Sequence, residues 1–172
     1  GIMIIQEDYK NFVNELRKNL KNNNKKIVFL CIGTNKISGD SLGALIGSNL
    51  NRLLMNNKEI DILGNFEKPI HALNIEESIK YINNKNKCVI VIDSAMSTKE
   101  LVGKIFVTKC KTKLNCGIDK EKIEIGDISI KYSICEDLKD KYKNLQVLRE
   151  MPVQLVVDLS NIISLGIYEA IL

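Results

Sequence analysis

Two short apolar runs constrain the fold of this chain more than any other feature. Residues 27–32 read IVFLCI and residues 88–93 read CVIVID, and Asp93 is the only charged residue in either run. A strand that is apolar on both faces must be covered on both faces, as happens in parallel sheets that lie between layers of helices. The two runs therefore predict an α/β fold in which they form central strands.

Helical patterns separate these strands from their neighbours in the sequence. Apolar residues recur three or four positions apart over about residues 6–21, 42–54 and 75–81, which predicts three amphipathic helices. A further apolar segment at 60–63 predicts another strand. The alternation of strands and helices indicates a parallel sheet with right-handed crossover connections.

The second half of the chain has a different pattern. Residues 103–108 and 127–132 read as two strands joined by a loop with no obvious helix, and we expect them to add an antiparallel or edge portion to the sheet. From Pro152 onward the apolar spacing predicts a C-terminal helix with proline in its first turn. The chain thus predicts a three-layer α/β/α sandwich with a mostly parallel, mixed central sheet. At 172 residues it suits a single domain, 1–172, in which residues 1–25 form an N-terminal helical extension.

Composition argues against several classes of function. The 25 basic and 21 acidic residues are interleaved and aromatic residues make up 5% of the chain, which argues against a nucleic-acid-binding protein. No uninterrupted apolar run reaches the roughly 18 residues that span a bilayer, and the N-terminus turns polar too early for a signal peptide. Five cysteines without CxxC spacing and a single histidine argue against a zinc site and favour a reducing cytoplasm.

Two aspartates fall where ligands bind in open parallel sheets, beyond the carboxyl ends of the strands. Asp93 closes the run CVIVID, and Asp40 lies in the loop that leaves the first strand. Gly33 and Gly39 let the backbone of that loop turn tightly. We expect both acids to face one crevice, with amides of the segment 33–35 available as donors to an oxyanion.

A close pair of carboxylates has several possible roles. Because like charges at short range cannot both ionise easily, one carboxyl keeps a proton to higher pH. The ionised member can then deprotonate water while the protonated member donates to a carbonyl oxygen. The same pair could hold a divalent cation. The structural alternatives are that Asp40 caps the following helix, as Ser38 or Ser41 also could, and that Asp93 only binds loop amides.

Several blocks of the sequence resemble one protein family. The blocks, in order, are CIGTNKISGDSLGALIGSNL, GNFEKPIHALNIEES, VIVIDSAMS, VGKIF and IGDISI. Over about residues 26–132 they are similar to the YyaC-like sporulation proteins of spore-forming Firmicutes, a family described as spore proteases. That family is related to the germination protease, which degrades small acid-soluble spore proteins, and to the hydrogenase-maturation peptidases. The resemblance implies their phosphorylase/hydrolase-like α/β/α sandwich.

The resemblance also implies an activity and a site. In the germination protease two aspartates carry catalysis, and Asp40 and Asp93 match their positions. The expected function is therefore a sporulation-associated peptidase that acts on a protein or peptide, with a sporulation protein as the candidate, and without metal or other cofactor. The expected location is the cytoplasm of the mother cell or forespore, without a nucleic-acid or membrane partner. The expected substrate-binding residues are Gly33, Thr34, Asn35, Ser94 and His71.

Departures from the family pattern keep two alternatives open. Ala44 replaces an expected proline, SAMS follows Asp93 in place of ACLG, and KCKTKLNCGIDK replaces a loop rich in glycine and proline. Because these changes rim the expected crevice, one alternative is a non-catalytic binding or scaffold protein with a peptidase-like fold. The other is a metal-dependent hydrolase with Asp40, Asp93 and His71 as ligands. The histidine of the hydrogenase-maturation peptidases follows the second acid, whereas His71 precedes Asp93, so we expect His71 to bond to a backbone carbonyl instead.

Overall fold

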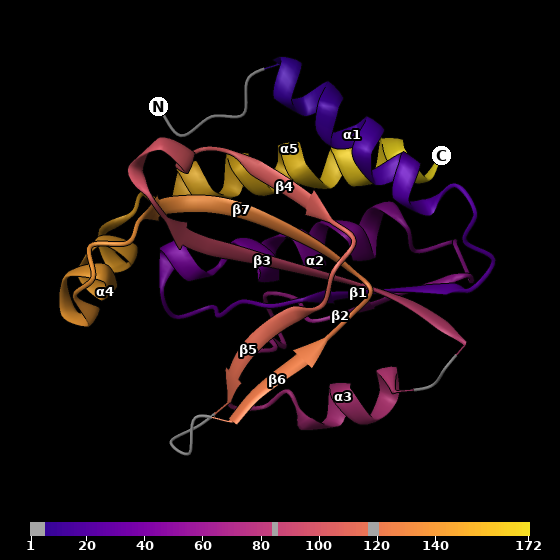
Figure 1. Cartoon of the computed structure of the whole chain (residues 1–172), viewed down its shortest axis with the longest axis horizontal. Helices are drawn as coiled ribbons and strands as arrows, with labels where there is room; N and C mark the ends of the chain where they lie inside the picture. The colour runs from indigo at the N-terminus through magenta and orange to yellow at the C-terminus, as the bar shows by residue number, and fades with distance from the viewer. Residues whose placement is uncertain (1–5, 84–85, 117–120) are drawn as a thin grey trace.

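A five-stranded sheet in the order β2-β1-β3-β7-β4 lies at the centre of the protein (Figure 1). The computed structural model describes residues 6–83, 86–116 and 121–172. Strands β1, β2, β3 and β7 run parallel, and β4 pairs with β7 in the antiparallel sense at the edge. The mostly parallel, mixed sheet is therefore confirmed, including the antiparallel edge. The strands are β1 (Lys26–Cys31), β2 (Ile60–Leu63), β3 (Lys87–Ser97), β4 (Ile105–Thr108) and β7 (Ile128–Glu136).

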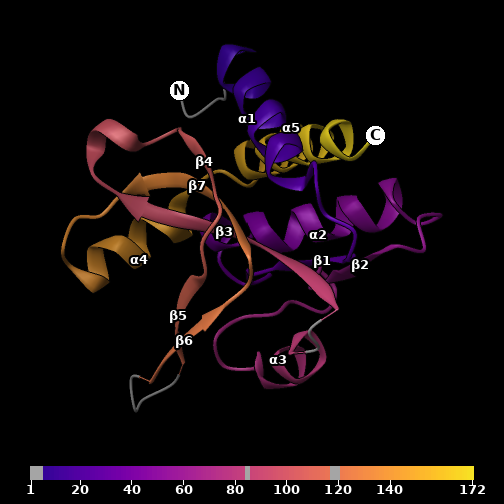
Figure 2. The same cartoon turned by 45° about the vertical axis from the view of Figure 1, so that its right-hand side comes forward.

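Both faces of the sheet are covered, as the apolar runs predict. One face carries α1 (Gln6–Leu20), α2 (Leu42–Leu53) and α5 (Val153–Ile171), and the other carries α3 (Glu76–Ile82) and a hairpin (Figures 1 and 2). Side chains alternate between the two faces along a strand. Phe29 and Ile90 therefore pack into a first core, beneath α1, α2 and α5, while Val28 and Val91 pack into a second core, beneath α3 and the hairpin. This arrangement confirms the three-layer sandwich.

Two elements of the second half differ from the prediction. The segment expected to be a loop forms the hairpin of β5 (Thr112–Cys116) and β6 (Glu121–Ile125), and α4 (Lys141–Glu150) was not predicted. The hairpin strands have few apolar residues, but Leu114 and Ile125 pack into the second core while Lys113 pairs with Glu124 outside. Helix α4 buries little apolar surface, so it lacks the apolar stripe by which a helix is recognised in a sequence. It begins at a capped turn. Residues 117–120, within the replaced loop, lie outside the described residues.

The N-terminal helix packs into the main core. Phe12, Val13 and Leu16 of α1 are buried, and α1 crosses α5 in both views (Figures 1 and 2). Gly166 of α5 makes this approach close, since a Cβ there would lie 2.7 Å from the Phe12 ring. Helix α1 is therefore part of the folded unit in this structure.

Helix α5 is long and apolar enough to span a bilayer when judged by length and composition alone. Its side chains Val156, Leu159, Ile163 and Ile167 are nevertheless buried in the core against α1 and α2. A core helix of a soluble protein passes the same test, so α5 is weak evidence for a membrane segment and the fold is compatible with a soluble protein.

Candidate functional site

Glycines bring α2 against the end of β1. A Cβ at Gly43 would overlap the carbonyl oxygen of Ile32 and lie 2.8 Å from its carbonyl carbon. A Cβ at Gly47 would overlap the carbonyl oxygen of Gly64 in the same way, and one at Gly33 would lie 2.8 Å from the amide nitrogen of Ala44. The backbone of α2 therefore touches the backbone at the carboxyl end of β1, which fixes the loop between them.

Asp40 is the last residue of a short 3-10 turn, η1 (Ser38–Asp40), in that loop. The Thr34 amide donates to the Asp40 carbonyl at 2.9 Å, which ties the turn to the end of β1. On the other side, the Ser38 hydroxyl donates to the Met151 carbonyl at 2.6 Å, beyond the end of α4. Helix α2 begins after Ser41, its N-cap residue, so the alternative that Asp40 caps this helix is wrong.

Asp93 lies within β3 and not at its end, which corrects the sequence-based prediction. The strand continues to Ser97 because β7 pairs with it beyond the apolar run, with Asp93 in register with Lys131. The neighbouring strand β1 ends at this level, where the Ile32 amide donates to the Ile92 carbonyl at 2.8 Å. Asp93 therefore lies where β1 stops, next to the loop that carries Asp40.

The negative charge of Asp40 acts on Asp93. Burial, followed by the negative charge of Asp40, raises the pKa of Asp93 from 3.8 to about 7. The Lys131 charge and a hydrogen bond from the Ser94 amide oppose this increase. Burial also raises the pKa of Asp40. Both side chains keep partial exposure to solvent, so the pair combines a group that holds its proton near neutral pH with an adjacent carboxylate.

Two of the three amides expected to bind an oxyanion, those of Gly33 and Thr34, already have acceptors. The Gly33 amide donates to the Ile70 carbonyl at 2.9 Å, and the Thr34 amide donates to Asp40 as described. The Asn35 side chain donates to the Phe66 carbonyl at 3.0 Å, which joins the loop after β1 to the loop after β2. These three residues shape the loop beside the acids, and Ser94 follows Asp93 on β3.

His71 lies at the same edge of the sheet but is held in a local turn. It follows Ile70, which forms a β-bridge with Ile32, and its own amide donates to the Asn74 side chain at 2.8 Å. Its Nδ1 accepts from the Leu73 amide at 3.2 Å, so the ring bonds a backbone amide where we expected a carbonyl. Among the described residues no three acid, histidine or cysteine side chains form a group that could hold a metal ion, so the three-ligand site is not assembled there.

Sequence reasoning missed two residues that lie beside the pair. Lys131 stands opposite Asp93 on β7, and Cys135, further along β7, is buried close enough to Asp40 that the aspartate charge, after burial, raises the thiol pKa. The one charged residue of the segment ISIKYSI was a signal, because an unpaired charge is costly within a central strand. Its partner could not be read from the sequence, since it depends on the register of β3 and β7.

Comparison with known proteins connects this fold to a family. The model of the family described as "Protein of unknown function (DUF1256)" matches residues 3–166. The chain is also similar to the protein named "Uncharacterized protein YyaC" of Bacillus subtilis (strain 168), with 30% identity over 145 residues. That alignment covers 83% of this chain and 68% of the relative. Both matches extend beyond residues 26–132, the range noted from the sequence blocks, and the family match includes α1.

Proposed function

The chain belongs to the DUF1256 family, and we propose that it is a peptidase in which Asp40 and Asp93 hydrolyse an amide bond of a protein substrate. One observation carries this proposal: burial, with the added effect of the Asp40 charge, raises the pKa of Asp93 to about 7, where the carboxyl end of β1 meets β3. Perturbed acids at such an edge are typical of catalytic groups.

The two acids can serve as the general acid and the general base of amide hydrolysis. Asp93, whose pKa is about 7, serves as the protonated member and donates its proton to the carbonyl oxygen of the substrate. Asp40, as the carboxylate, accepts a proton from the water whose oxygen attacks the carbonyl carbon. When the carbon–nitrogen bond breaks, Asp40 gives its proton to the leaving amine and Asp93 recovers its own from the oxygen. The positive charge of Lys131 limits the rise in the Asp93 pKa, which keeps this proton transferable near neutral pH.

The resemblance to the YyaC-like sporulation proteins supports a sporulation protein as the substrate. It also supports the cytoplasm of the mother cell or forespore as the place of action. Acid-soluble spore proteins are therefore the first substrates to test.

We expect Asp40→Asn and Asp93→Asn each to reduce cleavage of acid-soluble spore proteins by about a hundredfold or more, because each removes one partner of the proton transfers. New N-termini detected by mass spectrometry measure the rate. Asp158→Asn in α5 is the matched control and should retain wild-type activity. Equal cleavage by the wild type and both variants would exclude the aspartate mechanism.

A non-catalytic binding protein is the second candidate. It is favoured by four cavities in the described part of the chain, of about 620, 540, 620 and 240 Å³, none of which is lined by Asp40 or Asp93. On this alternative the wild type cleaves none of the spore proteins but retains one of them in a stable complex on size-exclusion chromatography. Cleavage that depends on Asp93 would rule it out.

A further inference from the structure

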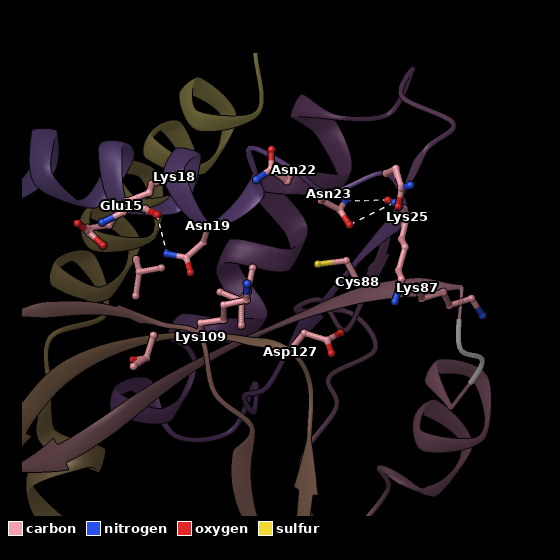
Figure 3. A pocket seen from close by; sticks show the side chains of 14 residues that line it. Glu15, Lys18, Asn19, Asn22, Asn23, Lys25, Lys87, Cys88, Lys109 and Asp127 are labelled. Atoms are coloured by element: carbon pink, nitrogen blue, oxygen red, sulfur yellow. Dashed lines mark hydrogen bonds between the residues drawn. The ribbon is translucent and has the colours of Figure 1, made fainter.

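A cavity of about 620 Å³ lies at the end of the sheet opposite the aspartates (Figure 3). It is bounded by the last turn of α1, the segment that leads into β1, and the adjacent ends of β3, β4 and β7. Cys88 and Asp93 are five residues apart on β3, so the cavity and the aspartate pair are separated by about 16 Å. The cavity is thus a separate place from the proposed peptidase site.

Lysines and asparagines dominate the lining. The cavity has four lysines and two acids, which gives it a net charge of +2, and its remaining polar side chains are mostly asparagine amides. The lysines are Lys18, Lys25, Lys87 and Lys109, and the asparagines are Asn19, Asn22, Asn23 and Asn24. Ammonium and amide groups are hydrogen-bond donors, which suits an anionic ligand.

Two of the lysines lie close to the Cys88 thiol in the cavity wall. The charges of Lys25 and Lys109 both lower the pKa of the Cys88 thiol, against the larger effects of burial and of Asp127, so both ammonium groups lie near this sulfur. They come from segments far apart in the sequence, the segment before β1 and the end of β4. Figure 3 shows Cys88 between Lys109 on one side and Lys25 on the other.

These cations are only partly offset by the two acids of the cavity, Glu15 and Asp127. Within the described ranges, Lys18, Lys25 and Lys109 form no ion pair with a carboxylate. Asp127 is engaged elsewhere, since its Oδ2 accepts the Val89 amide at 2.8 Å. Lys87 is also engaged, because it donates to the Tyr81 carbonyl at 2.7 Å and lies over the Tyr81 ring. Three ammonium groups therefore remain available around one concave space.

We propose that this cavity binds a small polyanion, a molecule that carries two or more neighbouring phosphate or carboxylate groups. Its volume falls within the usual range for small-molecule sites, about 300–1,000 Å³. Nucleic acid is disfavoured because none of the lining residues is aromatic, so bases have no ring on which to stack. The proposal is independent of whether Asp40 and Asp93 hydrolyse peptides.

Calorimetric titration of the full chain with pyrophosphate and with citrate, at constant ionic strength, tests the proposal and distinguishes phosphate from carboxylate ligands. We expect at least one probe to bind with a Kd below about 1 mM. Lys25→Gln combined with Lys109→Gln should weaken binding by about tenfold or more. Lys141→Gln combined with Lys143→Gln, which removes two exposed charges from α4, is the matched control and should bind as the wild type does.

Nuclear magnetic resonance locates the site in the same samples. Amide shifts on titration should concentrate at Cys88, Thr108 and Lys109 and leave Asp93 and Ser94 unchanged. Three results would overturn the proposal: no binding of either probe, equal losses in both double variants, or displacement of the probes by a single-stranded oligonucleotide that binds more tightly.

Discussion

Gly43→Ala is expected to destabilise the protein by about 4 kcal/mol or more, which places it among the most damaging single substitutions. The added methyl group would overlap the Ile32 carbonyl oxygen, and the atoms that it meets are backbone atoms of the residue that follows the central strand β1. Alanine is favoured over glycine in a helix by about 1 kcal/mol, but that gain is smaller than the cost of moving α2 away from the sheet. Urea denaturation followed by circular dichroism measures the change.

Asn51→Ala in the same helix is the control. Asn51 is exposed on α2, so its truncation should change the free energy of unfolding by no more than about 0.5 kcal/mol. A Gly43→Ala variant that unfolds at a urea concentration close to that of the wild type would show that α2 does not depend on backbone contact with β1.

Asp93→Asn is expected to stabilise the folded protein at pH 8 by about 2 to 4 kcal/mol and to have little effect near pH 4. The folded state raises the pKa of Asp93 from 3.8 to about 7, so between these values the folded chain binds more protons than the unfolded chain. Wild-type stability therefore falls as pH rises through this window, and the full cost is present above pH 7. Asparagine cannot ionise and avoids that cost.

Urea denaturation of wild type and variant at pH 4 and pH 8 measures this difference. Asp158→Asn, on α5, is the control and should shift the free energy of unfolding by a similar small amount at both pH values. An Asp93→Asn variant that is less stable than the wild type at pH 8 would contradict the account, because it would mean that the ionised carboxylate stabilises the fold.

The fold follows closely from the sequence, for physical reasons that differ between the two halves of the chain. The runs at 27–32 and 88–93 are apolar on both faces, and such segments have little alternative to a central strand covered on both sides. The β5–β6 hairpin has no comparable run, because it contributes one face to a core and leaves the other in solvent. Its place in the third layer depends on tertiary packing.

The candidate site is only partly predictable in the same way. Asp40 and Asp93 could be selected because both lie near the carboxyl ends of predicted parallel strands. Lys131 could not be assigned to Asp93, because the pairing of β3 with β7 joins residues nearly forty positions apart and is set by the register of the whole sheet. The internal hydrogen bonds of the Gly33 and Thr34 amides depend on how the following loop folds back, which side-chain patterns do not encode.

The central claim, that Asp40 and Asp93 form one electrostatic unit, is tested most directly by carbon-13 magnetic resonance titration of the Asp93 carboxyl group. The wild type should titrate near pH 7, Asp40→Asn should move the midpoint to lower pH, and Lys131→Met should move it to higher pH. A midpoint near pH 4 in the wild type, or one that neither substitution changes, would contradict the claim.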